Sequence, residues 1–278
     1  MKLTVLIDNN SFIDRYFLAE PGVSYIIETE GKKILFDVGY SNAFILNAQK
    51  MFINLWDIDY VVLSHGHLDH TWGLFSLIQL YTEGLIEKLP LKRPTLITHP
   101  LTFSTRKFNE LSEIGSLISE EKISVHFNSK FSKEPVFLTE KLVFLGEIER
   151  INKFEAKNPI GTIVIDGIEK DDFIIDDSAL AYKSANGLVI ITGCSHAGIC
   201  NIVEYAKKVC REERIVDIIG GFHLQNPSIE QLQGTIDYMK SLCPSSVHAC
   251  HCTDLNSKIE LSKVVNLKEV GVGLTLEY

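Results

Sequence analysis

One segment carries most of the information in this chain: Val61-Val62-Leu63-Ser64-His65-Gly66-His67-Leu68-Asp69-His70. Its apolar, β-branched beginning predicts a buried strand, and its polar end predicts the loop that follows. Three histidines and an aspartate lie within six positions of this loop, a density that core packing does not require. Imidazole nitrogens and carboxylate oxygens are ligands of zinc, iron and manganese. The loop therefore predicts a metal site.

The spacing within the loop indicates how the ligands are shared. His65 and His67 are two residues apart, so on an extended backbone their side chains point the same way and can hold one ion. Asp69 and His70 come from the turn that follows and can reach a second ion. A hydrogen-bonded turn without a metal is the alternative, but four ligand-type side chains together favour metal binding.

The composition limits the class of protein. The chain has 278 residues, of which 45% are hydrophobic, so it can bury a large core. Its net charge of −9 argues against a nucleic-acid surface, which needs clustered lysine and arginine. No apolar stretch reaches the ~18 residues that cross a bilayer. All six cysteines lie in the last third of the chain, unlike a secreted disulfide scaffold. We expect a cytoplasmic protein with reduced thiols.

Hydrophobic periodicity predicts alternating strands and helices. In the first part we expect strands at residues 3–7, 23–29, 33–38, 58–63 and 95–98, and helices at 41–51 and 71–82. From residue 161 we expect strands at 162–165, 173–175, 179–182, 188–192, 215–219 and 246–249, helices at 199–211 and 229–242, and a final helix and strand. Residues 101–157 are less regular, and we interpret them as an insertion within a single domain spanning 1–278. The alternating order implies parallel strands with helices on the sheet faces.

The ends of parallel strands meet at one rim, where ligands and active sites gather. Three strands of the second half are followed by histidines, namely His196, His223 and His251. We expect His196 and His251 to be further metal ligands, with a helix-terminal or rim position as the alternative. His223 is as easily a substrate-facing residue. Cys194 can bind a metal as a thiolate, although a lone cysteine at a strand end is usually a small buried hydrophobe.

Other polar residues at strand ends have two interpretations each. Asp37 either orients the loop histidines or caps a turn. Asp176 and Asp177 either face a cation or form a simple turn. His248 is expected to point away from the cleft, and His126 is expected on a strand of the insertion.

Taken together, these motifs resemble the metallo-β-lactamase fold superfamily, whose hallmark is His-x-His-x-Asp-His after a strand. The chain looks most similar to the dihydropteroate-synthase-like branch, which includes dihydropterin ribofuranosyl-aminobenzene phosphate synthases. The shared motifs include Thr-Gly-Cys-Ser-His-Ala-Gly-Ile at 192–199, Gly-Gly-Phe-His-Leu at 220–224 and His-Cys-Thr at 251–253. The resemblance spans nearly the whole chain. It implies an α/β fold (α+β in some schemes), a four-layer αββα sandwich with a metal site at one edge of the sheets.

The same resemblance implies a division of the ligands. His65 and His67 would hold a first metal, and Asp69, His70 and His251 would hold a second. We expect one or two ions of zinc or of another divalent transition metal, such as manganese or iron.

The chain departs from the superfamily at the expected bridging ligand. The superfamily usually has an aspartate between the two metals, but no Gly-Asp ends the strand predicted at 188–192. Cys194 and His196 stand there instead. The bridging ligand is therefore left open among Cys194, His196, Asp176 and Asp177.

These ligands predict a metal-dependent hydrolase. A metal lowers the pKa of bound water from ~15.7 toward ~7, so hydroxide can attack an ester, lactone or phosphoester of a small anionic substrate. Asp69 would be the catalytic residue that orients the nucleophile. The candidate substrate contacts are Arg106, Arg150, His223 and Asp177, since guanidinium groups suit phosphate or carboxylate. Solvated surface charge is the alternative for each arginine.

Two other functions remain open. One is a synthase or transferase that joins a pterin to a ribofuranosyl-aminobenzene phosphate, and the other is a non-catalytic metal-binding sensor. In each case the expected partner is a small molecule, with neither nucleic acid nor membrane. The sequence leaves the oligomeric state open, a homo-oligomer included.

Overall fold

The computed structural model describes residues 1–278, and most of its strands form two large sheets. The strands of the first sheet are β1 (Lys2–Ile7), β2 (Ser24–Thr29), β3 (Lys32–Phe36), β4 (Tyr60–Val62), β5 (Thr95–Thr98), β7 (Asn128–Phe131) and β16 (Thr275–Glu277). Those of the second sheet are β8 (Val136–Phe137), β9 (Leu142–Phe144), β12 (Ala179–Ser184), β13 (Gly187–Thr192), β14 (Ile215–Gly221) and β15 (Ser246–Cys250). A small third sheet contains β6 (Arg106–Lys107), β10 (Thr162–Ile165) and β11 (Ile168–Asp171).

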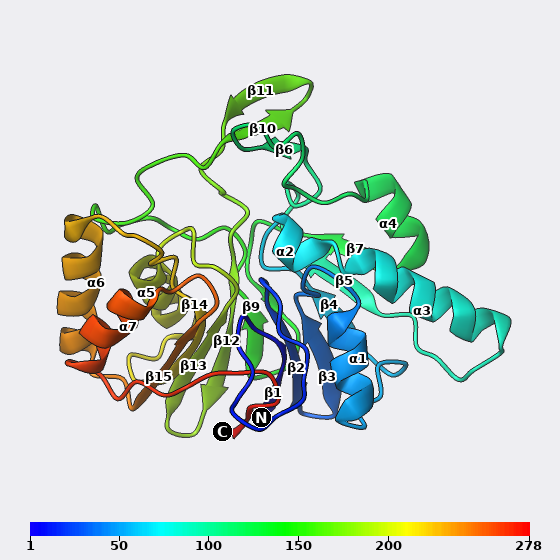
Figure 1. Cartoon of the computed structure of the whole chain (residues 1–278), viewed down its shortest axis with the longest axis horizontal. Coiled ribbons are helices and arrows are strands. Elements are labelled where there is room, and N and C mark those ends of the chain that lie inside the picture. The colour runs from blue at the N-terminus through cyan, green and yellow to red at the C-terminus, as the bar shows by residue number, and fades with distance from the viewer.

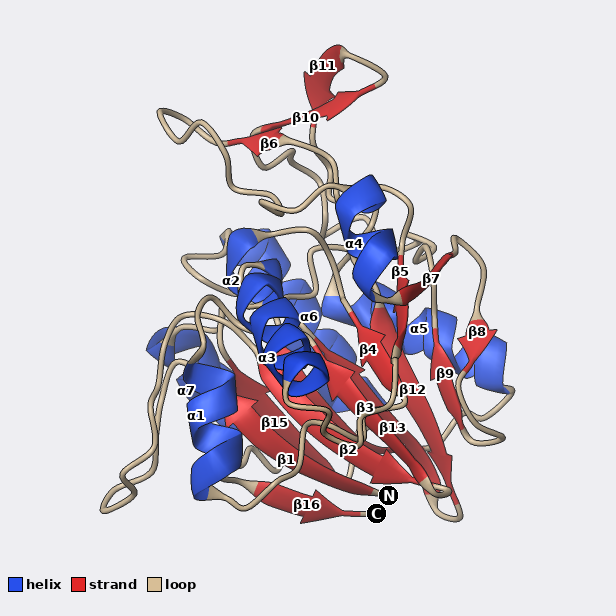
Figure 2. Ribbon diagram, turned by 90° about the vertical axis from the view of Figure 1, so that its right-hand side faces the viewer, coloured by secondary structure: helices blue, strands red, loops and turns tan.

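The helices lie outside the two large sheets (Figures 1 and 2). They are α1 (Ala43–Lys50), α2 (Leu68–Thr71), α3 (Leu74–Ile86), α4 (Glu120–His126), α5 (Ile199–Cys210), α6 (Ile229–Leu242) and α7 (Leu255–Ser262). One apolar cluster joins Leu35 of the first sheet to Phe44 of α1 and Leu77 of α3. A second joins Ile218 of the second sheet to Val203 of α5. The resulting order of layers is αββα, which confirms the predicted fold class.

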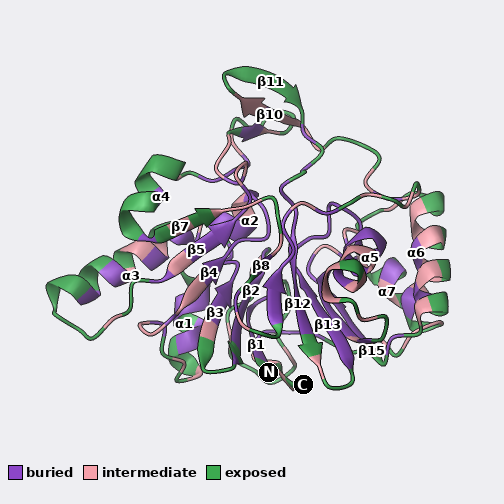
Figure 3. Cartoon of the chain, turned by 180° about the vertical axis from the view of Figure 1, so that it is seen from behind, coloured by how far each residue is buried: buried purple, intermediate pink, exposed green.

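A third apolar cluster fills the space between the sheets and includes Val5, Phe36, Phe144 and Ile191. Both faces of each sheet are therefore covered. This explains the nearly continuous apolar runs of the strands, since a strand covered on both sides has no solvent face. All six residues of β13 are buried, and Figure 3 shows the central strands buried and the outer turns of the helices exposed.

The strand directions bring several strand ends to one rim. β3, β4, β5 and β7 run parallel, and so do β13, β14 and β15. The hairpin β2–β3 turns at Glu30 and Gly31, and the hairpin β12–β13 turns at Ala185 and Asn186, just before Gly187. The rim lies where the chain leaves β4 and enters α2 (Figure 1).

Three local predictions are wrong. Residues 173–175 form no strand, because the Phe173 and Ile174 carbonyls accept hydrogen bonds from the Arg150 side chain; the strand of this region is β11. The helix predicted at 71–82 is divided into α2 and α3, and the break lies at Trp72 and Gly73. His126 ends helix α4 instead of lying on a strand.

The segment 101–157 contributes to all three sheets. β6 pairs with β10, β7 pairs with β5, and β9 pairs with β12. Its strand β6 stands away from the two large sheets, together with β10 and β11 (Figure 1). That this segment is an insertion stays a prediction. None of the helices is long and apolar enough to span a bilayer.

Candidate metal centre

The backbone at the rim is strained where the candidate ligands are presented. Asp37, Ser195, His223 and His251 have φ angles of +52°, +62°, +49° and +45°. A left-handed conformation costs a residue with a Cβ free energy, and such residues concentrate at functional sites. The strain lies at the ends of β3, β13, β14 and β15, the strand ends that converge on the rim.

The first group of donors forms around His65. His65 Nε2 and His67 Nδ1 face each other at 3.1 Å. The ring centre of His196 lies 4.7 Å from that of His65 and 4.8 Å from that of His67. Ligand atoms of His65, Cys194 and His196 lie within 4.8 Å of one another.

Unsatisfied nitrogens show that this group fits a metal. Both ring nitrogens of His196 and Nε2 of His67 are buried and have no hydrogen-bond partner. Buried polar atoms in proteins normally have a partner, because desolvating them without one costs free energy. A cation beside these imidazoles would supply the missing partner to His196.

The second group contains Asp69, His70, Cys194 and His251. Cys194 Sγ lies 3.2 Å from Nε2 of His70 and 3.2 Å from Nε2 of His251. Asp69 Oδ2 lies 3.2 Å from His251 Nε2 and 3.7 Å from His70 Nε2. Ligands at about 2.0–2.3 Å from a tetrahedral zinc are separated by roughly 3.3–3.8 Å, so this cage has the size of a metal site.

Hydrogen bonds fix the orientation of two histidines in the second group. His70 Nδ1 donates to Asp37 Oδ2 at 2.7 Å, and Ser64 donates to the same carboxylate from both N and Oγ, each at 2.7 Å. His251 Nδ1 lies 2.8 Å from Asn9 Oδ1. When Nδ1 of each ring is bound in this way, Nε2 is left free to face the donors of the site.

Burial keeps the first group neutral. It lowers the pKa of His65, and the neighbouring histidines lower it further. The pKa of His196 is lowered in the same way, with His223 the largest neighbour. Burial, followed by the charge of Arg106, lowers the pKa of His67 to about 3. Neutral imidazole is the form that binds a metal, so these rings are already in the protonation state that coordination requires.

The charges in the second group have the opposite effect on pKa. Burial alone would lower the pKa of His70, but the charges of Asp69 and Asp37 raise it to about 9. Burial would raise the pKa of the Asp69 carboxyl, but His70 and His251 hold it below its ordinary value. A metal cation in this position would supply the positive charge that protonated His70 otherwise supplies to the two carboxylates.

Both groups open into a cavity of about 800 Å³. Its lining includes His67, Asp69, Cys194, His196, His223 and His251, together with residues of the β1–β2 segment and of α7. Only four of its sixteen lining residues are hydrophobic, and Lys258 of α7 is the one lysine or arginine among them. The cavity therefore suits a polar molecule of modest size.

Arg106 does not reach this cavity, contrary to expectation. It is fully buried, with Nε donating to Asp172 Oδ2 at 2.8 Å and Nη2 to Asp176 Oδ1 at 2.6 Å. Asp176 also accepts a hydrogen bond from the Gly66 backbone at 2.9 Å. Arg106 thus supports the histidine loop from behind, and the substrate contact expected for it is not supported.

Two more of the expected substrate contacts lie elsewhere. Arg150 is bound to backbone carbonyls, and Asp177 is fully buried and accepts from the Ala197 backbone at 2.8 Å. Neither lines the cavity. His223 does, with its ring centre 4.3 Å from that of His196 and a buried Nδ1 without a partner.

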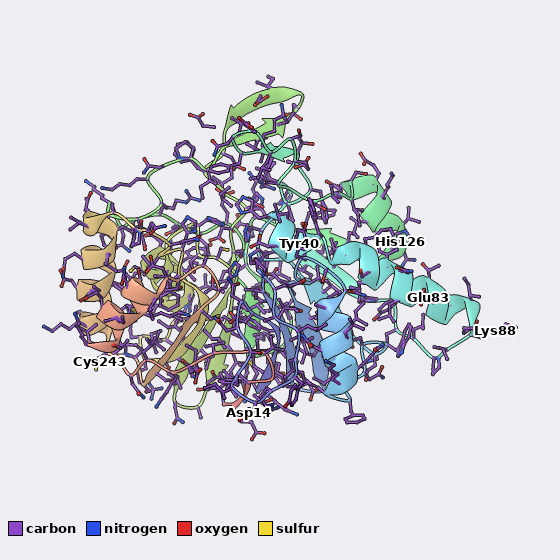
Figure 4. All side chains as sticks on the ribbon, in the orientation of Figure 1. Asp14, Tyr40, Glu83, Lys88, His126 and Cys243 are labelled. Carbon is purple, nitrogen blue, oxygen red and sulfur yellow. The ribbon has the colours of Figure 1, made fainter.

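Cys194, which the sequence left open between a metal ligand and a small buried hydrophobe, belongs to both donor groups. The structure also adds Asn9 and Lys258, which the sequence did not single out. Asn9 follows β1, whose end lies on the same rim, so the polar run after that strand could have indicated it. Lys258 stands on an ordinary helix and gave no signal. His248 pairs with Asp217 at 2.9 Å, away from the cavity, while His126 lies far from it on α4 (Figure 4).

Several known proteins are similar to this chain in sequence and in architecture. Residues 18–175 match the family described as Metallo-beta-lactamase superfamily. The chain is 30% identical over 277 residues to 7,8-dihydropterin-6-methyl-4-(beta-D-ribofuranosyl)-aminobenzene-5'-phosphate synthase of Methanocaldococcus jannaschii, covering 93% of this chain and 89% of that protein. A second, uncharacterized protein of that organism is 31% identical over 275 residues, covering 98% of each.

A solved structure extends this agreement to three dimensions. The crystal structure of a metal-dependent hydrolase of the β-lactamase superfamily superposes with a TM-score of 0.83 at 28% identity, covering 100% of this chain and 99% of that one. The family match includes the loop from His65 to His70 and more than half of the chain. The chain therefore belongs to the metallo-β-lactamase superfamily.

Proposed function

We propose that this protein is a metal-dependent hydrolase that cleaves an ester, lactone or phosphoester bond of a small anionic molecule. The observation that carries the proposal is the convergence of two groups of metal-binding side chains on the floor of one polar cavity. Membership of the superfamily implies a divalent metal, and the unsatisfied nitrogens at the rim are consistent with one.

Each donor group would hold one ion. His65, His67 and His196 would hold the first, and Asp69, His70 and His251 the second. When bound, such ions polarise a substrate oxygen and make water a better nucleophile at neutral pH. Zinc is the ion that this mixture of imidazole, carboxylate and thiol donors suits best, with iron and manganese as alternatives.

The chain's own side chains would position the reactants. Asp69 is partly exposed to the cavity and has its carboxyl pKa held low, so it stays ionised and can orient a water molecule by accepting a hydrogen bond from it. His223 lines the cavity, so its ring can contact the substrate. Lys258 can attract the anionic group, since a cationic side chain at the cavity wall complements phosphate or carboxylate.

The test is hydrolysis of a panel of esters, lactones and phosphoesters by the metal-free protein and by its zinc, manganese and iron forms. We expect turnover of at least one anionic member in a metal-loaded form and none in the metal-free form. No turnover of any member in every metal form would overturn the proposal.

A synthase is the second candidate, because the similarity to the M. jannaschii enzyme covers nearly the whole of both chains. The product that its name describes contains a pterin and a phosphate, and the same polar cavity and Lys258 would suit such a phosphate. Incubation of the metal-loaded protein with a ribofuranosyl-aminobenzene phosphate and a dihydropterin that carries a leaving group on its 6-methyl carbon distinguishes the two reactions, since that leaving group departs as the new bond forms. Formation of the joined product supports the synthase, whereas release of inorganic phosphate or an alcohol supports the hydrolase.

A further inference from the structure

We infer that Cys194 bridges two metal ions as a thiolate, which makes this a sulfur-bridged binuclear centre. The inference rests on the proposed metal binding, but it does not depend on the reaction that the metals support. It assigns the ligand that would take the place of the bridging aspartate usual in the superfamily.

The position of the sulfur is the first argument. Cys194 is the only residue that belongs to both donor groups. Its Sγ lies 3.2 Å from the His70 and His251 nitrogens of the second group, and its distances to the His65 and His196 nitrogens of the first are within 4.8 Å. A ligand of the second ion alone would not need to lie against both groups.

The alternatives for a bridge are less well placed. The Asp176 carboxylate is taken up by Arg106 and the Gly66 backbone. The Asp177 carboxylate lies on the far side of His65, with Oδ1 3.9 Å from Nδ1 of that ring, the nitrogen that faces away from His67. His196 belongs to the first group only.

The backbone holds the sulfur in this position. Cys194 follows β13, and Gly193 before it packs so closely on Ser64 and Asp37 that an added Cβ would collide with their side chains. This close packing brings the end of β13 in the second sheet against the ends of β3 and β4 in the first sheet, beside Cys194. Its side chain is buried and its thiol is free of any disulfide.

The chemistry of the thiol is compatible with a bridge. A thiolate sulfur has several lone pairs and can bind two cations, and metal coordination deprotonates a cysteine that burial alone keeps neutral. The thiol proton leaves to solvent as the two sulfur–metal bonds form. Because thiolate is a soft ligand, the centre should prefer zinc or iron to manganese.

Cys252 is the neighbouring thiol that must be distinguished. Its Sγ donates to the Cys194 carbonyl at 3.3 Å and accepts from the His223 backbone at 3.3 Å. It also lines the cavity, but it belongs to neither donor group. A Cys252→Ser variant is therefore the closest control, and Cys243→Ser, at the exposed end of α6, is a remote one (Figure 4).

The experiment is titration of the metal-free protein with Co²⁺, followed by absorption spectroscopy. A sulfur–cobalt bond gives a charge-transfer band in the near ultraviolet. We expect the wild-type band to grow through two equivalents of Co²⁺, since each ion binds the same sulfur. Cys252→Ser and Cys243→Ser should give the same titration.

Two substitutions at the bridge complete the test. Cys194→Ser should lose the charge-transfer band and bind Co²⁺ more weakly at both sites. Cys194→Asp should also lose the band but retain two ions, because a carboxylate can bridge; circular dichroism should show both variants folded. Should Cys194→Asp misfold, the wild-type titration and the Cys252→Ser variant still decide the question.

Any one of the following results in the Co²⁺ titrations would overturn the inference. They are a band that survives Cys194→Ser, a band that disappears in Cys252→Ser, and a wild-type band complete after one equivalent. Two ions bound by the wild type without any sulfur band would contradict the bridge and leave the proposed function intact. Failure of the wild type to bind Co²⁺ at all would remove both.

Discussion

Asp37 shows how a single residue can control the site without touching a substrate. Its buried carboxylate accepts from His70 Nδ1 and from two groups of Ser64, so it holds both the second donor group and the start of the histidine loop. It is a positioning residue, and its carboxylate also makes the His70 imidazole more basic and so a stronger metal ligand.

Replacing Asp37 by Asn should weaken metal binding without removing a ligand. We expect a roughly 10- to 100-fold loss of zinc affinity, the range typical for such partners of metal ligands. The measurement is competition against a chromophoric chelator, with the exposed Asp14→Asn as the matched control (Figure 4). An unchanged affinity would mean that Asp37 serves the fold alone.

Lys258 is the residue on which the anionic nature of the substrate can be tested. Lys258→Gln removes the charge but keeps most of the side-chain length. For an anionic substrate found in the panel, we expect KM to rise roughly 10-fold, the equivalent of about 1.4 kcal/mol, with kcat little changed. Lys263→Gln, on an exposed residue just after α7 that does not line the cavity, is the control. An equal rise in KM for a neutral substrate would show that Lys258 does not recognise the negative charge of the substrate.

Residue chemistry made much of the candidate metal site predictable. His65, His67, Asp69 and His70 lie so close in sequence that their proximity in space needs no tertiary information. His196 and His251 followed from the rule that parallel strands end together. The sequence left Cys194 open between a metal ligand and a small buried hydrophobe, because a cysteine has the same pattern in either case; its distances to both donor groups favour the ligand.

At the scale of elements, the loop that carries the histidines is supported by a buried ion-pair network. Arg106 joins Asp172 and Asp176 with no exposure to solvent, and Asp176 reaches Gly66. The adjacent Lys107 pairs with Glu169, but these side chains are 43% and 47% exposed. The two neighbours therefore offer a comparison of a buried and an exposed pair.

Arg106→Met should destabilise the protein by about 3–5 kcal/mol, because it leaves two carboxylates buried without their partner. Lys107→Met should cost less than about 1 kcal/mol, since exposed pairs contribute little. Denaturant unfolding of the metal-free proteins measures both. Equal losses for the two variants would contradict the supporting role assigned to Arg106.

The first turn of helix α5 donates hydrogen bonds to the buried carboxylate of Glu155, which makes the free energy of unfolding depend on pH. Glu155 accepts from the Asn201 backbone at 2.7 Å and from the Cys200 backbone at 3.2 Å, and burial raises its pKa from 4.5 to about 7. The folded chain therefore holds this proton more tightly than the unfolded chain does. The stability that results is complete below the unfolded pKa and is lost as the pH rises through about 7.

Glu155→Gln should remove this part of the pH dependence. The difference in unfolding free energy between wild type and variant should change by up to roughly 3 kcal/mol across this range, in favour of the wild type at low pH. Denaturant unfolding at a series of pH values, in the presence of chelator, measures it. A difference that stays constant with pH would contradict the raised pKa.

At the scale of the whole molecule, the long buried strands and amphipathic helices were predictable, because each carries its own hydrophobic period. The small strands β6 and β7 were not, since two to four partly exposed residues have no distinct pattern and pair only with distant partners. Strand β8 pairs with the nearby β9, but its two residues are too few to carry a pattern. The prediction of a strand at 173–175 was wrong for a different reason. Its apolar run is local, but Arg150 and Asp172 bind the backbone groups that a ladder would need.

The same scale explains where the site lies. Two sheets share one core, and both direct strand ends to one rim, so donors separated by more than a hundred residues come within a few ångströms. Neither sheet alone contains a complete donor group: Cys194 and His251 come from the second sheet, and the histidine loop comes from the first.

The most direct test of this arrangement is anomalous X-ray scattering from crystals of the zinc-reconstituted protein. We predict two anomalous peaks, one among His65, His67 and His196 and the other among Asp69, His70 and His251. Crystals that contain zinc elsewhere, or none, with no peak at this rim would contradict the account.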